Sequence, residues 1–266
     1  MVGYDFKFLL EKVRSERPLI HNITNYVAMN FTANALLAMG ASPVMADALD
    51  EVEEMVSLAS ALVINIGTLS KKWIESMLTA GRKANALGVP IILDPVGSGA
   101  TSFRTNTFRS LITELKLTVV RGNPSEILSI TANSIKTKGV ETSHTAQQAL
   151  DAAKQVAKEI NAVAAITGAV DVITDGEKTI RCYNGHALLG SVTGTGCAVT
   201  STIAAFASVT SDPLEATAAG LAFFGLAGEV AGVRAQSPGS FMIFLLDALH
   251  QITPEEFQAK ARLDTG

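Results

Sequence analysis

The chain of 266 residues contains only two cysteines, Cys182 and Cys197. Two are too few for a disulfide framework, and a chain of this length can bury a core without one, so a reducing compartment is expected. Charge is also scarce: 17% of residues are charged, against 48% hydrophobic, which excludes a disordered chain. The net charge of −4 leaves no basic excess, so we expect no nucleic-acid partner and no binding to anionic lipid.

The sequence also lacks an uninterrupted hydrophobic run of the roughly 20 residues that a membrane span needs. Its most apolar stretch, Thr217 to Val233, carries four glycines and Glu229. The N-terminus, from Met1 to Arg17, has the charges of an amphipathic helix rather than the apolar run of a signal peptide. We therefore expect a cytoplasmic protein with no membrane association.

Short apolar runs alternate with longer amphipathic segments along most of the chain. This alternation predicts βαβ units and a largely parallel sheet within a single domain of residues 1–266. The predicted strands are Pro43–Met45, Leu62–Ile66, Pro90–Leu93, Thr118–Val120 and Ala162–Ile166, followed by a hairpin of Val170–Thr174 and Lys178–Tyr183 around Asp175-Gly176-Glu177. The predicted helices are Glu51–Ala59 capped by Asp50, Lys71–Leu87 capped by Ser70, Thr145–Ile160, Gly196–Val209, Pro213–Gly232, Gly239–Ile252, and Pro254–Arg262 with Thr253 and Glu256 as a capping box.

Polar and glycine residues follow four of the predicted strands. They are Asn65-Ile66-Gly67-Thr68, Asp94-Pro95-Val96-Gly97, Arg121-Gly122-Asn123-Pro124 and Thr167-Gly168. Any one of them is equally compatible with an ordinary turn. Ligands of open parallel sheets bind beyond the carboxyl ends of the strands, so four such ends in register predict one extended site.

The segment Gly194-Thr195-Gly196-Cys197 comes directly before an apolar helical stretch. Glycines at a helix start let backbone N–H groups approach an anion, and the helix dipole adds a favourable field, although a plain glycine-rich turn has the same sequence. No Lys-Ser/Thr follows and no third glycine completes a dinucleotide fingerprint, which argues against a P-loop NTPase and a Rossmann dehydrogenase. At the first helical turn, Cys197 is expected to have a lowered thiol pKa, unless it is simply a small buried hydrophobic residue.

Two carboxylates and one arginine lie at the same predicted edge. Asp94 ends an apolar strand and Glu126 opens a helix after Asn123-Pro124. Carboxylates of this kind hold the Mg²⁺ that accompanies ATP, whereas Glu126 alone would also suit a helix N-terminus. Arg121 is placed to bind phosphate, or to be a surface arginine. The four histidines have no metal-ligand spacing, so no zinc site is expected.

Taken together and in order, these motifs resemble the hydroxyethylthiazole kinases, which are ribokinase-like enzymes of thiamine salvage. The motifs are His21-Asn22-Ile23-Thr24-Asn25, Gly67-Thr68, Asp94-Pro95-Val96-Gly97, Arg121-Gly122-Asn123-Pro124-Ser125-Glu126, Thr167-Gly168 and Gly194-Thr195-Gly196-Cys197. The Asn-Pro-x-Glu motif and the glycine loop are common to ribokinase-like kinases. The opening motif, and a cysteine where most relatives have aspartate, are specific to the smaller family.

The resemblance implies a fold, a reaction and an assembly. The fold is ribokinase-like α/β, with a mostly parallel central sheet and helices on both faces. The reaction is Mg²⁺-dependent transfer of the ATP γ-phosphate to the hydroxyl of 4-methyl-5-(2-hydroxyethyl)thiazole, and the assembly is a homotrimer with active sites between subunits. The implied roles are Arg121 and Thr167 for ATP, Asp94 and Glu126 for Mg²⁺ and its waters, Asn25, Met45, Gly67 and Gly194 for the thiazole, Gly194, Thr195 and Gly196 for the anion hole, and Cys197 as the catalytic residue facing the hydroxyl.

Three other functions are compatible with the same motifs. A hydroxymethylpyrimidine kinase would more often carry aspartate at position 197. An ATP-dependent dehydratase of hydrated nicotinamide cofactors would leave no phosphorylated alcohol, and a nucleotide-sensing subunit would bind without turnover. Identification of the products formed from ATP, Mg²⁺ and candidate alcohols distinguishes all four.

Overall fold

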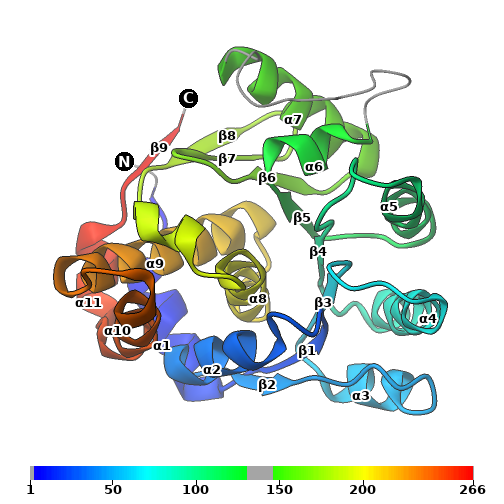
Figure 1. Ribbon diagram of the computed structural model, residues 1–266, viewed down its shortest axis with the longest axis horizontal. Coiled ribbons are helices and arrows are strands. Elements are labelled where there is room, and N and C mark those ends of the chain that lie inside the picture. Colours follow the sequence, from blue (N-terminus) through cyan, green and yellow to red (C-terminus); the bar gives the residue numbers. More distant parts are fainter. Residues whose placement is uncertain (1–2, 131–145, 266) are drawn as a thin grey trace.

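A nine-stranded sheet runs through the computed structural model, which describes residues 3–130 and 146–265 (Figure 1). The strand order is β2-β1-β3-β4-β5-β6-β7-β8-β9, and neighbouring strands are parallel as far as β6 and antiparallel from there on. The strands are β1 (Leu19–Ile23), β2 (Ser42–Val44), β3 (Ala61–Asn65), β4 (Ile91–Asp94), β5 (Val119–Gly122), β6 (Val163–Ile166), β7 (Asp171–Thr174), β8 (Thr179–Cys182) and β9 (Leu263–Thr265). This confirms the predicted α/β fold with a mostly parallel sheet.

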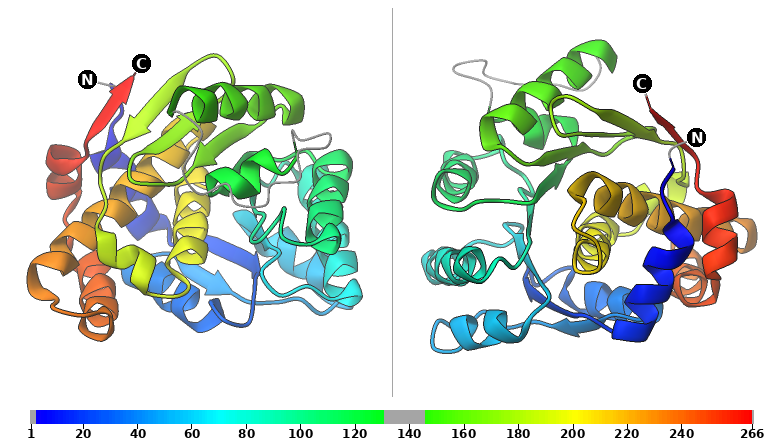
Figure 2. Two further views of the ribbon diagram at one scale, coloured as in Figure 1. Left: turned by 45° about the horizontal axis from the view of Figure 1, so that its top comes forward. Right: turned by 180° about the vertical axis from the view of Figure 1, so that it is seen from behind.

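Helices cover both faces of this curved sheet, as Figures 1 and 2 show. On the outer face lie α3 (Val52–Leu58), α4 (Lys71–Leu87), α5 (Ser102–Glu114), α6 (Pro124–Leu128) and α7 (Ala146–Ile160). The inner face holds α1 (Phe6–Glu16), α2 (Met29–Met39), α8 (Thr195–Ala207), α9 (Pro213–Arg234), α10 (Pro238–Gln251) and α11 (Pro254–Lys260), with the 3₁₀ turn η1 (Ala187–Ser191) leading into α8.

Each central strand is buried on both faces and contributes side chains to two separate hydrophobic cores. In β3, Leu62 and Ile64 pack with the helices of the outer face, whereas Val63 between them packs with the helices of the inner face. Successive side chains of a strand point to opposite faces, so a continuous apolar run is what a doubly covered parallel strand requires. This is why β3, β4, β5 and β6 could be identified from their sequence.

Helices α8 and α9 pack together at very short range under the inner face of the sheet. A Cβ atom at Gly220 would lie 2.7 Å from the Cα atom of Ile203, so only glycine allows this approach. The apolar character of α9 follows from its position between α8 and α10. It is long and apolar enough to cross a membrane, but 78% of its most apolar stretch is buried inside the molecule, as in the core helix of a globular protein.

Several predicted boundaries were wrong. Asp50 does not cap the third helix, because that helix starts at Val52 with Glu51 at its N-cap position and no side-chain hydrogen bond. Thr253 accepts a hydrogen bond from the backbone of Glu256, but only that half of the predicted capping box is formed. The elements that were not predicted include β1, β9, α5 and the 3₁₀ turn η1. The predicted helix Thr145–Ile160 is confirmed from Ala146, since residue 145 lies outside the described residues.

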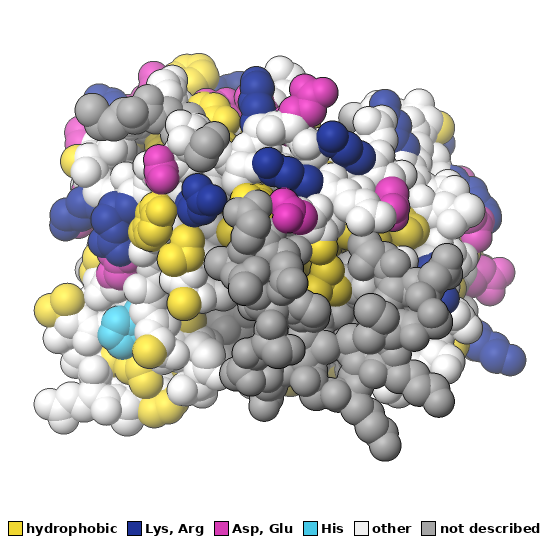
Figure 3. Space-filling model, turned by 90° about the horizontal axis from the view of Figure 1, so that it is seen from above, with side chains coloured by type: hydrophobic (Ala, Val, Ile, Leu, Met, Phe, Trp, Pro, Cys, Tyr) yellow, Lys and Arg dark blue, Asp and Glu magenta, His cyan; other side chains and the backbone are white. Residues whose placement is uncertain are grey.

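The surface above the antiparallel end of the sheet is of mixed charge. In Figure 3, which views the molecule from the top of Figure 1, Lys and Arg side chains alternate with Asp and Glu outside the grey atoms. The visible part of this face therefore carries no large field of one sign.

Candidate active site

The four polar strand ends lie side by side at one edge of the sheet. Strands β3, β4, β5 and β6 are consecutive and parallel, with Asn65 opposite Asp94 and Gly122 opposite Ile166. This confirms that the motifs predicted to form one extended site share an edge. The N-terminal end of α8 adjoins the same edge, because Arg121 of β5 donates to the backbone oxygen of Gly196 (3.2 Å).

Helix α8 begins directly after Gly194, whose backbone has a left-handed conformation. Gly194 is the N-cap of α8 with φ +86°, and it has no side chain that could accept from the first-turn N–H groups. The Thr195 hydroxyl instead anchors the loop, since it donates to the carbonyl oxygens of Leu189 (2.8 Å) and Val192 (3.0 Å). The backbone N–H groups at this helix start are thus the kind of donor that binds an anion.

A chain of hydrogen bonds connects the cysteine to the buried aspartate. The Nδ2 atom of Asn25 donates to Cys197 Sγ (3.1 Å) and to Asn65 Oδ1 (2.9 Å), and Asn65 Nδ2 donates to Asp94 Oδ2 (3.0 Å). Asn25 is itself fixed, because its Oδ1 accepts from the backbone of Ala28 (3.0 Å). These groups come from the β1–α2 loop, two strand ends and α8, so the tertiary fold assembles them.

The carboxyl group of Asp94 is fully buried at the centre of this network. Its Oδ2 accepts from Thr200 (2.9 Å) as well as from Asn65, and Arg121 lies 3.8 Å away. Burial raises the pKa of Asp94 to about 7, although Arg121 lowers it. Its other oxygen, Oδ1, is buried and has no hydrogen-bond partner among the described residues, so it keeps its capacity to accept from a ligand.

The expected lowering of the Cys197 pKa is wrong. Burial of the thiol, and after it the charge of Asp94, raise the pKa of Cys197 to about 11. The helix dipole favours the thiolate, but desolvation in this largely enclosed position has the greater effect. At neutral pH Cys197 is therefore a thiol, and it cannot act as a preformed thiolate base.

Arg121 and Thr167 form a second polar pair next to the glycine loop. Arg121 Nη2 donates to the hydroxyl of Thr167 (2.8 Å), and the guanidinium is mostly buried, with 13% of its side chain exposed. Its Nε–H is buried without a partner. Three of the predicted ligand groups, Arg121, Thr167 and Gly196, thus converge in one chain, with a free donor among them.

Glu126 makes two structural contacts that the motif alone did not predict. Its Oε2 accepts from the N–H of Asn123 (2.8 Å), which completes a capping box at the start of α6, and its Oε1 accepts from Gly97 (2.8 Å). The helix-terminus role considered from the sequence is therefore real. It does not exclude a role toward a cation, because an ionised carboxylate accepts about four hydrogen bonds.

The pair of carboxylates fits a magnesium ion. Mg²⁺ typically takes one or two protein carboxylates, keeps several waters and shares the phosphates of its nucleotide. Asp94 offers the unpartnered oxygen, and the charge of Glu126 is near enough to raise the pKa of Asp94. Glu126 would act through water, since both of its oxygens already hold backbone N–H groups.

Three residues expected to bind the thiazole, Asn25, Gly67 and Gly194, lie close together within one chain. A Cβ atom at Gly67 would lie 2.8 Å from Asn25, so glycine is needed to seat Asn25, and Gly194 lies against Ala28 just after it. The separation of these segments in sequence is therefore no argument for an inter-subunit site. Met45 is different: it follows the edge strand β2, is partly exposed, and has no hydrogen bond to this group among the described residues.

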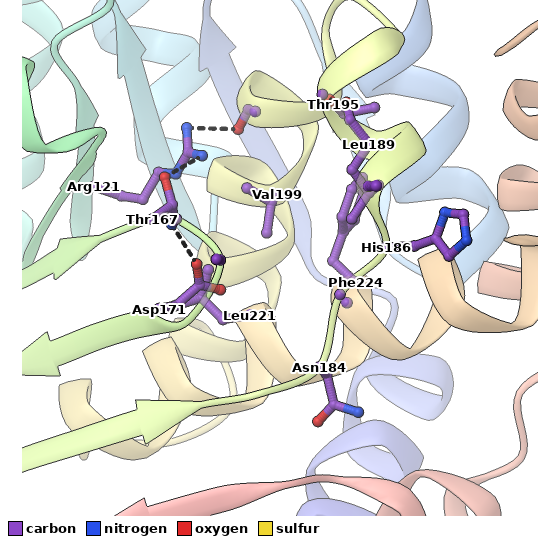
Figure 4. A pocket seen from close by; sticks show the side chains of 17 residues that line it. Arg121, Thr167, Asp171, Asn184, His186, Leu189, Thr195, Val199, Leu221 and Phe224 are labelled. Atoms are coloured by element: carbon purple, nitrogen blue, oxygen red, sulfur yellow. Dashed lines mark hydrogen bonds between the residues drawn. The ribbon is translucent and has the colours of Figure 1, made fainter. Parts of the chain in front are cut away.

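A cavity of about 590 Å³ opens beside Arg121, between the β6–β7 turn, η1, α8 and α9 (Figure 4). Thr195 and Gly196 lie at one end of its lining, and Asn184 and Gly185 come from the segment after β8. Its apolar lining includes Leu189, Val199, Leu221 and Phe224. The cavity has the mixed lining of a small-molecule site: apolar walls with a few placed polar groups.

Two residues of the site, Thr200 and Arg104, escaped sequence reasoning. Asn65 and Thr200 donate to Asp94, and Arg104 of α5 donates to the carbonyls of Ile66 (2.9 Å), Val96 (2.6 Å) and Gly67 (2.8 Å). Arg104 thereby ties together the loops after β3 and β4. Asn65 belongs to one of the polar strand ends that predicted the site, but Thr200 and Arg104 lie within helices and gave no signal.

Known proteins of high similarity cover nearly the whole chain. The family model described as the hydroxyethylthiazole kinase family matches residues 10–255. The hydroxyethylthiazole kinase of Desulfotalea psychrophila is 54% identical over 254 residues, which cover 96% of this chain and 93% of that protein. A solved hydroxyethylthiazole kinase structure from Pyrococcus horikoshii OT3 has a TM-score of 0.90 and 47% identity, with 98% of each chain covered.

A more distant structure supports the fold alone. A ribokinase-like superfamily protein from Enterococcus faecalis has a TM-score of 0.64 at 14% identity, with 96% of this chain covered. The expected ribokinase-like architecture is thus confirmed. On the match of the family model and the high identity over nearly its whole length, this chain belongs to the hydroxyethylthiazole kinase family.

Proposed function

We propose that this kinase transfers the γ-phosphate of ATP to the hydroxyl of 4-methyl-5-(2-hydroxyethyl)thiazole in thiamine salvage. The observation that carries the proposal is the convergence of two groups of different chemistry at one helix start. Arg121, Thr167 and the Gly194–Gly196 backbone suit phosphate, and the Asn25–Cys197 pair lies directly beside them. A phosphoryl donor and a small alcohol can thereby be held next to each other, which is most of what phosphoryl transfer needs.

ATP would lie in the cavity with its γ-phosphate at the start of α8. There the N–H groups of the first turn and the unpartnered Nε–H of Arg121 supply donors for the phosphoryl oxygens. The nucleoside would extend toward the apolar lining from α9, which includes Leu221 and Phe224. Arg121 is the contact that orients the phosphate chain, because its two terminal nitrogens are already fixed by Thr167 and Gly196.

Mg²⁺ would be held by Asp94, with Glu126 acting on its waters. The bound ion would neutralise charge on the phosphates of the donor nucleotide. The residues of this chain prepare that position. Thr200 and Asn65 hold one oxygen of Asp94 and orient the carboxyl group, while its unpartnered Oδ1 is left for the ion.

Cys197 would face the hydroxyl of the acceptor and fix its position for in-line attack. In the transfer, the alcohol oxygen forms a bond to the γ-phosphorus as the bond to the leaving oxygen of ADP breaks, and the hydroxyl proton is lost to solvent. Because the pKa of Cys197 is raised to about 11, the thiol orients the hydroxyl and is not ionised beforehand. Asn25 fixes the Sγ atom at the place where that contact is needed.

The acceptor test compares two alcohols under identical conditions. Incubation with ATP, Mg²⁺ and either hydroxyethylthiazole or hydroxymethylpyrimidine, with products identified by mass, is expected to give thiazole phosphate at a much higher kcat/KM. Equal or reversed preference would refute the thiazole assignment and leave the kinase activity standing. Release of phosphate without a phosphorylated alcohol, or binding without turnover, would refute the kinase assignment as well.

We also propose that the active enzyme is a cytoplasmic homotrimer in which Met45 reaches the site of a neighbouring subunit. Large apolar side chains are exposed before α2, on α2 and on α10, which pack together: Tyr26 (69%), Val27 (64%), Leu37 (53%) and Ile243 (60%). An apolar surface of this kind suits a subunit interface. Light scattering of an active preparation should give three times the chain mass, and a monomer mass would exclude a shared site.

A further inference from the structure

The carboxylate of Asp171 lies in the wall of the cavity, and neither the family motifs nor the proposed roles account for it. Asp171 is the first residue of β7, and Figure 4 shows its side chain on the same side of the cavity as Arg121 and Thr167. Leu221 lines the same cavity. A carboxylate is an unexpected part of a site for a triphosphate, because like charges repel. Its position along the cavity therefore restricts what it can face.

In the proposed function, the phosphates of ATP lie on the opposite side of Thr167 from Asp171. The helix start at Gly194–Gly196 and the guanidinium of Arg121 attract negative charge, whereas Asp171 lies beyond Thr167 from Arg121 in Figure 4, in a cavity that is also lined by Leu221 and Phe224. The part of a nucleoside triphosphate that follows the phosphates is the sugar. Ribose carries two vicinal hydroxyls, which are good donors to a carboxylate.

The carboxylate is held in a fixed orientation and keeps capacity for a ligand. Its Oδ1 accepts from the N–H of Gly168 (2.9 Å), which braces the β6–β7 turn. An ionised carboxylate accepts about four hydrogen bonds, so the turn uses only part of its capacity. Burial raises the pKa of Asp171 to about 6, while Gly168 and Arg121 lower it, so the group is mostly ionised at neutral pH.

We propose that Asp171 accepts hydrogen bonds from the ribose hydroxyls of the nucleotide and selects ribonucleotides as phosphoryl donors. Carboxylates serve this purpose in dinucleotide folds, where an acidic residue binds the ribose 2′-hydroxyl, and the same chemistry applies here. The proposal rests on the nucleotide site of the proposed function but not on the identity of the acceptor. Asp171 would determine affinity and donor choice and leave the transferring phosphoryl untouched.

The test measures nucleotide binding by calorimetry with Mg²⁺ and without any acceptor. The parent is expected to bind ATP about tenfold tighter than 2′,3′-dideoxy-ATP, since each hydrogen bond to a charged group contributes appreciably. Asp171→Asn keeps an oxygen for Gly168 and should bind both nucleotides about equally, at the level of the parent with the dideoxy compound. In a turnover assay with the alcohol that the enzyme phosphorylates, kcat at saturating ATP should change less than twofold, while KM for ATP rises about tenfold.

Asp175→Asn is the matched control on the same hairpin. Asp175 accepts from the backbone of Glu177 (2.8 Å) and Lys178 (2.7 Å) in the β7–β8 turn, outside the cavity lining, so its variant should keep the tenfold discrimination. A parent that does not discriminate between the two nucleotides would overturn the proposal. So would an Asp171→Asn variant that discriminates as the parent does. Failure to phosphorylate the thiazole would refute the acceptor assignment and leave this binding result intact.

Discussion

Replacing Asp94 by asparagine is expected to stabilise the ligand-free protein while it abolishes activity. The carboxyl group is fully buried, and burial raises its pKa from 3.8 to about 7. The folded state therefore holds the proton more tightly than the unfolded state, so this group destabilises the fold increasingly as pH rises from about 4 toward 8. Asparagine has the same shape, and its carbonyl oxygen can still accept from Asn65 (3.0 Å) and Thr200 (2.9 Å).

The magnitude follows from the two pKa values. Linkage gives an ionisation cost of about 2 kcal/mol at pH 5 and about 4 kcal/mol at pH 8, at 1.36 kcal/mol per pKa unit. The new amide nitrogen at the position of the unpartnered Oδ1 offsets about 1 kcal/mol of the gain at both pH values. The stability advantage of Asp94→Asn should thus increase by about 2 kcal/mol between pH 5 and pH 8.

Urea unfolding of the parent and of Asp94→Asn, each at pH 5 and pH 8 with EDTA and without nucleotide, measures this difference directly. Titrating groups that are distant from Asp94 affect both proteins equally and cancel in the comparison. Activity with Mg²⁺ and ATP should fall at least 100-fold in the variant, because the site loses its charge at the position proposed for the ion. Parallel stability profiles of the two proteins across this pH range would refute the inferred burial cost.

Three further substitutions test other parts of the site and the core. Glu126→Gln should lower kcat at least tenfold. It should also lower Tm, because the one oxygen of glutamine must replace the two carboxylate oxygens that accept backbone N–H groups. Unchanged kcat in a kinetic assay and unchanged Tm in a thermal melt would contradict both roles of Glu126. Cys197→Ala should lower kcat about tenfold at unchanged ATP affinity, because it removes the side chain proposed to orient the acceptor hydroxyl. Cys197→Asp keeps a polar group for this contact and should remain active; a fully active alanine variant with an unfolded aspartate variant would make Cys197 a packing residue. Gly220→Ala should lower the free energy of unfolding in urea by more than about 2 kcal/mol, because its Cβ would meet the backbone of Ile203. The control Gly239→Ala, in open space at the start of α10, should be neutral or slightly stabilising. Equal effects of the two substitutions would contradict the close helix contact.

The elements with a strong local pattern could be predicted from the sequence. Strands β3 and β4 are continuous apolar runs, and α4 has both its Ser70 cap and its Gly88 stop. Strand β1 was missed because its buried residues include His21 and Asn22, which interrupt the apolar run. Their polar groups have partners that include distant residues: the Nε2 atom of His21 lies 2.7 Å from the oxygen of Ala46, and Asn22 accepts from Ser201 and donates to the oxygen of Ile20 (2.8 Å).

The residues of the site also divide into those that a local sequence pattern indicates and those that only the tertiary fold brings into place. Asp94, Arg121 and the glycine loop could be predicted because each sits where a strand ends or a helix begins, and chain geometry brings such ends together. Thr200 and Arg104 act from within helices, so their contribution depends on how those helices are placed. The pKa of Cys197 depends on burial by the whole fold, and its position after Gly196 indicated the opposite direction.

The packing of the first helix on the last has a consequence for synthesis. Phe6 of α1 stacks on Phe257 of α11, and Lys7 hydrogen-bonds to Gln258 and pairs with Glu255, so the two ends of the chain lie together (Figure 2). Nearly the whole chain must leave the ribosome before α1 can find this partner. Until then its buried face has no complete core to cover it, and contacts between such distant segments form slowly. The stable packing of α1 therefore depends on α11, and a chain that is truncated before α11 should have an α1 that is open to proteolysis.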